Sequence, residues 1–323
     1  PLGLPFCGFW IPLGHEPIRP GNHMIKQLAV FATSLWVSLL ITGCSSTSRL
    51  TSQSVENAVV KPEDQEQLAQ RERIDLLLAQ GDIAARDGKI EYAFHLFLNA
   101  EKLAPSDDRA LVRAGNLHRT LGNREMAIKA WRIALDRNPS NGNVHESLGF
   151  LLLETGQYDA AVNAFEQAVL LATEKRRAMI GLGLACEKRQ DFERALTIYD
   201  TALRAEPAAV ELLTYRARTL MNLGRFIESK SVIASIINEP IQATWIVRGD
   251  LFAIDGDYAA ALGAYLEGLS EQWAYQRLGE HALRQDELDH ALRFFRQASA
   301  ASPRFFADAE NGVAVTLEKL RNK

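Results

Sequence analysis

The chain has 323 residues, of which 47% are hydrophobic and 24% are charged, a composition typical of soluble globular and repeat proteins. Its formal net charge of -4 provides no basic excess to neutralise a phosphate backbone, which argues against a nucleic-acid partner. The three cysteines, Cys7, Cys44 and Cys186, are too few and too scattered to predict a disulfide framework or a zinc cluster.

The beginning of the chain predicts a targeting segment rather than part of the fold. Residues 1–23 contain five prolines and no Met, and we interpret them as sequence upstream of a start at Met24. Lys26 then precedes an apolar run over residues 28–40, which fits a signal peptide and is shorter than the roughly 20 residues that span a bilayer. We therefore expect a signal peptide over residues 24–43.

The junction that closes this segment consists of Ile41, Thr42, Gly43 and Cys44. An aliphatic residue, a small residue, Gly and Cys in this order resemble the lipobox of bacterial lipoproteins. The resemblance implies that Cys44 is lipidated, that the peptide is cut before it, and that several acyl chains anchor the protein. Ser45 after the cysteine implies the periplasmic face of the outer membrane. A cleaved secretory signal with an incidental cysteine is the alternative.

A tether and a helix start follow the junction. Residues 44–61 are rich in Ser and Thr and lack sustained periodicity, which predicts a flexible tether behind the lipidated cysteine. Pro62, Glu63 and Asp64 are typical of a first helical turn, where proline is tolerated and acids favour the positive end of the helix dipole.

An internal repeat organises the remainder of the chain. Small residues recur in register, the first four each 34 residues after the one before, at Gly81, Gly115, Gly149, Gly183, Ala217, Gly249 and Gly279. A second column of small residues follows at Ala93, Ala127, Ala161, Ala195, Ser229, Ala261 and Ala291. A column of bulky residues comes four positions later, at Phe97, Trp131, Phe165, Tyr199, Ile233, Tyr265 and Phe295.

Each column has a mechanical interpretation. Small residues let the two helices of a hairpin approach closely, and bulky residues fill the space between hairpins, so we expect a tight contact between Gly149 and Ala161. Further glycines predict left-handed helix ends between the two helices, at Gly88, Gly122, Gly156, Gly224 and Gly256. Prolines lie at the repeat ends, where a helix must stop, at Pro105, Pro139, Pro207, Pro240 and Pro303.

The register resembles the tetratricopeptide (TPR) family, since Leu precedes Gly149, Gly183 and Gly279, and Trp245 stands in the family's Trp column. The resemblance covers about residues 74–305 and implies an all-α fold, a TPR α-solenoid that winds as a right-handed superhelix of seven helical hairpins. We expect seven repeats within residues 62–305, at about 74–107, 108–141, 142–175, 176–209, 210–241, 242–271 and 272–305. Apolar residues at helical spacing predict a C-terminal capping helix over residues 306–323.

No pattern in the sequence predicts catalysis. Gly181, Gly183 and Cys186 superficially suggest a dinucleotide-binding loop, but the repeat register places them inside a helix with no strand before it. Cys186 occupies an inward column, which favours a small core residue over a nucleophile. The histidines show no metal-ligand spacing. We therefore expect no enzyme activity, no cofactor, no metal and no small-molecule substrate.

The TPR resemblance implies that one side of each hairpin's first helix lines a concave groove that binds partner peptides. At about 100° per residue, four positions of these helices cluster on that side. The candidate groove residues are Arg109, Asn116, Arg119, Phe150, Leu153, Ile180, Leu184, Arg218, Met221, Ile246 and Trp273. Apolar side chains would hold a helical or extended segment of another protein and the arginines would pair with its acids. The alternative is that neighbouring repeats bury several of these residues.

The sequence thus predicts a lipid-anchored protein-binding scaffold at the periplasmic face of the outer membrane. A lipobox combined with TPRs is similar to the TadD-type lipoproteins of tight-adherence (Flp) pilus assembly, whose partners would be pilus or secretin components. Pilotins of type IV pili have a similar plan. Adaptors that hold cell-wall hydrolases or proteases are a further alternative.

Overall fold

The computed structural model describes residues 62–322, except 172–173, 237–239, 303 and 305. The predicted signal peptide, the lipidated Cys44 and the tether lie outside these residues. Within the described part, no helix is long and apolar enough to cross a membrane.

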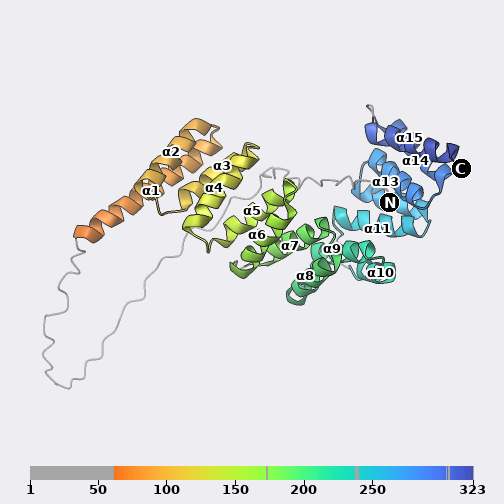
Figure 1. The fold of residues 1–323 in the computed structure, drawn as a ribbon, viewed down its shortest axis with the longest axis horizontal. Coiled ribbons are helices and arrows are strands. Elements are labelled where there is room, and N and C mark those ends of the chain that lie inside the picture. Colours follow the sequence, from red (N-terminus) through yellow and green to blue (C-terminus); the bar gives the residue numbers. More distant parts are fainter. Residues whose placement is uncertain (1–61, 172–173, 237–239, 303, 305, 323) are drawn as a thin grey trace, which may run out of the picture. The chain divides into compact units, whose positions relative to one another are not determined.

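The described residues form fifteen α-helices (Figure 1). They are α1 (Pro62–Arg86), α2 (Ile90–Leu103), α3 (Arg109–Thr120), α4 (Arg124–Arg137), α5 (Gly142–Glu154), α6 (Tyr158–Leu171), α7 (Arg176–Lys188), α8 (Phe192–Ala205), α9 (Val210–Asn222), α10 (Phe226–Ala234), α11 (Gln242–Ile254), α12 (Tyr258–Gly268), α13 (Glu271–Arg284), α14 (Leu288–Ala301) and α15 (Ala307–Arg321). Consecutive helices pair as seven hairpins, and each hairpin packs on the next. The predicted TPR solenoid of seven hairpins and a capping helix is confirmed.

Short turns close the hairpins with a left-handed residue. The predicted turn glycines, Gly88 to Gly256, have φ between 74° and 80°, a region that a side chain disfavours. The fourth and seventh hairpins use Gln190 and Asp286 at this place, with φ of 63° and 62°. The turn geometry is therefore kept even where the sequence lacks the glycine.

In every hairpin except the fifth, the first helix has a glycine in contact with the bulky residue of the second helix. A Cβ atom at Gly149 would lie 2.8 Å from the ring of Phe165, and one at Gly279 would lie 2.6 Å from the ring of Phe295. The same ring contacts hold for the glycines at 81, 115, 183 and 249. The expected contact of Gly149 with Ala161 stays a prediction. The space that the missing side chain leaves is filled by the Phe165 ring, one turn beyond Ala161.

Some of these rings also reach the following hairpin. Phe165, fully buried, lies against Gly149 of its own hairpin and against Gly181 of α7. Phe295 lies in the same way between Gly279 and Gly312 of the capping helix α15. One aromatic ring thus joins two hairpins, and α15 packs as the first helix of a further repeat would.

The fifth hairpin departs most from the sequence pattern, and a hydrogen bond accounts for one departure. Ser229 stands in the second small column and is completely buried. Its hydroxyl donates to the carbonyl oxygen of Ala217 on α9 at 2.7 Å. A buried hydroxyl with a partner carries little penalty, so serine serves in place of alanine here.

We predict that Gly149→Ala lowers the free energy of unfolding by about 1–3 kcal/mol, because the new methyl group overlaps the buried Phe165 ring. Gly263→Ala is the matched control, since Gly263 lies exposed in α12 with no atom within 4 Å of an added Cβ. That control change should be neutral or stabilise by up to about 1 kcal/mol. Urea unfolding of the two variants measures both, and equal effects would contradict the ring-on-glycine packing.

Candidate protein-binding face

The candidate face is formed by the odd-numbered helices, the first helices of the hairpins. Most successive odd-numbered helices contact each other directly, as α5 does with α7 and α11 with α13. We call the side of these helices that bears the predicted groove residues the helix-A face. Its residues come from different hairpins, so the packing between hairpins fixes their spacing.

An apolar patch lies on this face where α5 meets α7. It consists of Phe150 and Leu153 of α5 and Leu184 of α7, all half-buried and packed from outside against the main core cluster. The Phe150 ring meets the Phe165 ring edge to face, with centroids 4.9 Å apart. These three predicted residues therefore pack on one core cluster and keep part of their surface exposed.

A charged group covers one side of the patch. The guanidinium of Arg177 lies 5.0 Å from the centroid of the Phe150 ring and pairs with Glu146 at 3.1 Å. The Arg177 side chain remains 71% exposed, whereas that of Glu146 is 17% exposed. Burial raises the pKa of Glu146, and the charge of Arg177 opposes that shift. Neither Arg177 nor Glu146 was predicted from the helical spacing, because only the structure shows which side chain of the next helix covers Phe150.

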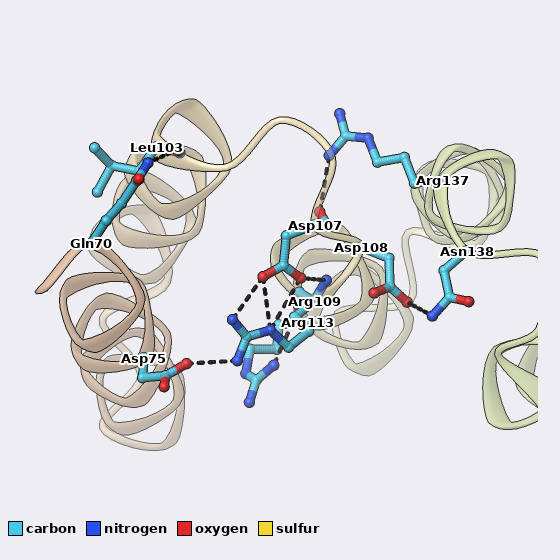
Figure 2. A network of polar contacts seen from close by, with 9 residues as sticks. All are labelled: Gln70, Asp75, Leu103, Asp107, Asp108, Arg109, Arg113, Arg137 and Asn138. Carbon is cyan, nitrogen blue, oxygen red and sulfur yellow. Dashed lines mark hydrogen bonds and ion pairs between the residues drawn. The ribbon is translucent and has the colours of Figure 1, made fainter. Parts of the chain in front are cut away.

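Two of the three predicted arginines, Arg109 and Arg218, are engaged within the chain. Figure 2 shows Arg109 between Asp75 of α1 and Asp107, with its nitrogens 2.6 Å and 2.8 Å from the two carboxylates. Arg218 donates twice to Glu187 of α7, at 3.1 Å and 2.8 Å. The expectation that Arg109 and Arg218 pair with a partner's acids stays a prediction, and such pairing would compete with these ion pairs inside the chain.

The remaining predicted residues divide between core and surface. Ile180 is only 6% exposed, so it offers almost nothing to a partner. Met221 and Ile246 are half-buried against separate core clusters, and Trp273 packs on Phe306 with centroids 4.6 Å apart. Asn116 and Arg119 are exposed on α3.

Loops between hairpins add further links. Asp108, 8% exposed, accepts hydrogen bonds from the side-chain amides of Asn138 and Asn141 in the next inter-hairpin loop, at 3.3 Å and 2.8 Å. Arg137 donates to the Asp107 carbonyl oxygen at 3.2 Å (Figure 2). It also pairs with Glu101 at 2.7 Å. Side chains of one hairpin thus satisfy polar groups of the one before.

A buried cluster of polar side chains joins the sixth and seventh hairpins. Asp250 of α11 is 1% exposed and accepts two hydrogen bonds from Arg277, both at 2.6 Å. It also accepts a bond from the Tyr265 hydroxyl at 2.7 Å and lies 3.0 Å from Nε2 of His281. Burial alone would raise the pKa of Asp250, but the charge and hydrogen bonds of Arg277 outweigh it and hold the pKa well below 3.8.

The fourth and fifth hairpins share a second cluster of the same design. Glu187 of α7 accepts from the Tyr199 hydroxyl at 3.1 Å and from the Thr219 hydroxyl at 2.7 Å, beside its two bonds from Arg218. In both clusters a tyrosine stands in the ring column, where most hairpins have a phenylalanine or tryptophan. A buried phenol needs a hydrogen-bond partner, so this tyrosine is the sequence signal that could have located both clusters.

These clusters hold hairpins together rather than offering reactive groups. Every carboxylate oxygen of Asp250 is bonded to a cation or a hydroxyl, and the pKa shift keeps it ionised.

Cys186 is 0% exposed, and burial raises the pKa of its thiol, which disfavours the reactive thiolate. Among the described residues no group of His, Cys, Asp and Glu is arranged to hold a metal ion.

Comparison with known proteins agrees with this geometry. Family models described as tetratricopeptide repeat match residues 108–141 and, in two overlapping stretches, 148–210 and 187–229. Residues 108–141 and 148–229 are thus tetratricopeptide repeats, and the fold is a TPR α-solenoid. Human tetratricopeptide repeat protein 21B is 24% identical over 222 residues, which cover 68% of this chain and 16% of that protein. Human protein O-mannosyl-transferase TMTC1 is 24% identical over 229 residues, 58% of this chain and 26% of the transferase. The chain thus spans a minor part of these relatives.

Solved structures share the fold of this TPR protein. A tetratricopeptide repeat protein from Parabacteroides merdae superposes with a TM-score of 0.61 at 20% identity, over 76% of this chain and 99% of that one. PilF of Pseudomonas aeruginosa gives 0.51 at 19% identity, over 62% and 91%. PilW, described as a widely conserved type IV pilus biogenesis factor, gives 0.50 at 18% identity, over 59% and 90%.

We predict that Asp250→Ala destabilises the protein by about 3 kcal/mol, because it leaves Arg277 and His281 without their buried acceptor. Tyr265→Phe is the matched control, and it should cost about 1 kcal/mol, the loss of one hydrogen bond. Since the folded pKa of Asp250 is lowered, its stabilisation is present above the unfolded pKa and is lost as the pH falls through the folded pKa. The difference in free energy of unfolding between wild type and Asp250→Ala should therefore be full at neutral pH and shrink as the pH is lowered. A difference that stays constant with pH would contradict this.

Proposed function

We propose that this TPR protein is a non-enzymatic scaffold that binds a segment of another protein on the helix-A face, centred on the apolar patch of Phe150, Leu153 and Leu184. The observation that carries the proposal is an exposed arginine, Arg177, placed over the half-buried aromatic ring of Phe150 on this face. Helical arrays use such surfaces to hold peptides through apolar anchors with flanking charges.

The chemistry of the patch defines the partner segment. Phe150, Leu153 and Leu184 would take one or two aliphatic or aromatic side chains, and Arg177 would pair with a carboxylate beside them. Arg109 is bonded to two acids of the chain, and Arg218 donates two hydrogen bonds to one. Arg177, in contrast, keeps most of its side chain exposed to solvent. The proposed ligand is thus a helical or extended peptide with apolar anchors and an acidic neighbour.

The proposed setting is the periplasmic face of the bacterial outer membrane, with Cys44 as the lipid anchor. The motif Ile41-Thr42-Gly43-Cys44 behind a short apolar run supports it. A role in pilus assembly is supported by the shared fold of PilF and PilW, of which PilW is described as a type IV pilus biogenesis factor. We propose a tight-adherence (Flp) or type IV pilus apparatus as the system served.

We predict that Cys44→Ser releases the protein from bacterial membranes into the soluble periplasmic fraction. Mass spectrometry of the mature wild-type chain should find an acylated Cys44 at its N-terminus. Cys186→Ser is the control and should stay in the membrane fraction, because Cys186 lies in the folded core. Membrane retention of Cys44→Ser, with an unmodified N-terminus elsewhere, would contradict the anchor.

We predict that Phe150→Ser combined with Leu184→Ser abolishes cross-linking of the anchored protein to its envelope partner. Met126→Ser combined with Leu266→Ser is the matched control, since these apolar residues of α4 and α12 are 50% and 49% exposed. Arg177→Ala is a milder test that leaves the core untouched and should weaken the same adduct.

The outcomes separate the alternatives. Adducts with pilus or secretin components that the patch variants lose would support the proposed function, and adducts with murein hydrolases or proteases would favour an adaptor instead. A large fall in melting temperature for the double patch variant would mean that Phe150 and Leu184 serve the core. In that case unchanged binding by Arg177→Ala would exclude the site.

A further inference from the structure

The outer face of α1, the first helix of the described chain, carries a largely apolar stripe. Leu76, Ala79, Gln80 and Ile83 follow one another at the i, i+3, i+4 and i+7 spacing that places residues on one side of a helix, and we call them the α1 stripe. Leu76 is 58% exposed and Ile83 is 50% exposed, and the two residues between them are exposed as well. The core of the first hairpin is formed instead by other residues of α1, such as Leu78.

The repeat register shows what this face does elsewhere in the molecule. The residues equivalent to Leu76 in the following hairpins are all buried: Ala110 at 4%, Val144 at 2%, and Ala178, Leu212, Thr244 and Ala274 at 0%. Those equivalent to Ile83 are buried too: Leu117 at 7%, Leu151 at 1%, Ala185 and Thr219 at 0%, Leu251 at 3% and His281 at 4%. Each of these helices packs on the preceding hairpin. The α1 stripe is therefore the same interface, with no hairpin before it among the residues that the structure describes.

The opposite end of the array is closed differently. The helix α15 buries Ala309 and Thr316 completely against the last hairpin. Its exposed residues include Asp308, Glu310 and Lys319. Because this end presents charged side chains, it does not match the apolar residues of the α1 stripe of another copy, and head-to-tail stacking lacks a complementary face.

The α1 stripe does match itself. When two α1 helices lie antiparallel, Leu76 of one copy meets Ile83 of the other. Ala79 of each copy then lies near the centre, where its small side chain allows a close approach. Gln80 lies beside it, and a side-chain amide both donates and accepts, so the two Gln80 amides can hydrogen-bond to each other across the pair.

Charges at the ends of the stripe favour the same arrangement. Glu72 lies one turn before Leu76 and Arg86 lies one turn after Ile83, and both are exposed. Antiparallel pairing sets each Glu72 beside Arg86 of the second copy. Parallel pairing would instead set like charges side by side, so the charge pattern selects the antiparallel pair.

We propose that two copies of this protein associate head to head through the outer faces of their α1 helices, related by a two-fold axis that passes near Ala79 and Gln80. The α1 stripe is the centre of this interface. It lies on a different helix from the Phe150 patch, so each copy keeps its helix-A site.

Light scattering of the purified full chain tests the proposal. Wild type should have twice the mass of one chain, and Leu76→Glu combined with Ile83→Glu should have the mass of one. Both residues are at least half exposed in one copy, so this variant should keep the wild-type helicity. Leu266→Glu is the matched control, since Leu266 is a 49% exposed leucine of α12, and it should remain a dimer.

A cysteine test locates the interface. Ala79→Cys should form a disulfide-linked dimer under mild oxidation, because residues beside a two-fold axis approach within the distance that a disulfide needs. Ala314→Cys, exposed on α15, should give no more linked dimer than wild type, which carries the same three native cysteines. A monomeric wild type, or a Leu76→Glu and Ile83→Glu variant that stays dimeric, would overturn the proposal. A monomer that the two glutamates destabilise would also overturn it, by showing that the chain's own residues cover the stripe.

Discussion

The contact of an aromatic ring with a bare stretch of helix backbone is the constraint on which this structure depends. In the third hairpin, the Phe165 ring lies where a side chain at Gly149 would have to be. The same ring also contacts Gly181 of the next hairpin. It therefore determines how the two helices of its own hairpin pack together and how the following hairpin packs on them. Because protein interiors are close-packed, each ring fixes the rotation of its helices, and with it the columns that face outward.

Buried polar side chains further stabilise the packing of neighbouring hairpins that the aromatic rings establish. Asp250 and Glu187 are each held by a tyrosine from their own hairpin and an arginine from the next. A buried carboxylate is tolerable only with such full pairing, so a hairpin that lost its neighbour would leave the charge exposed or unpaired. The stability of the array therefore depends on pairs of hairpins, and the binding face, built from several hairpins, depends on the same links.

The sequence predicts the fold well because the columns of the repeat report local packing needs. The small residues, the turn glycines and the helix-ending prolines each have one mechanical meaning, and the helices, the left-handed turns and the capping helix follow from them. The small residues alone did not predict that Phe165 fills the space at Gly149, since a spacing of small residues does not tell which neighbour fills the gap. Phe165 lies one turn beyond Ala161 along α6.

The candidate site was predictable only in part, for a related reason. Helical spacing placed Phe150, Leu153 and Leu184 on one side, and in the structure all three are half-buried against one core cluster. Helical spacing could not show that Arg109 and Arg218 form ion pairs within the chain, because the acids that pair with them come from other parts of the sequence. The prediction of Arg177 over Phe150 would have needed the geometry between hairpins.

The central claim is that the face of α5 and α7 at Phe150 is where this scaffold holds its protein partner. Photo-cross-linking in intact cells tests it most directly, with a photoreactive amino acid placed at Leu184 and, in a separate strain, at Leu266 of α12. The account predicts one protein adduct, identified by mass spectrometry as the same protein in repeated experiments, from position 184 and not from 266. The same adduct from both positions, or an adduct from position 266 alone, would contradict it.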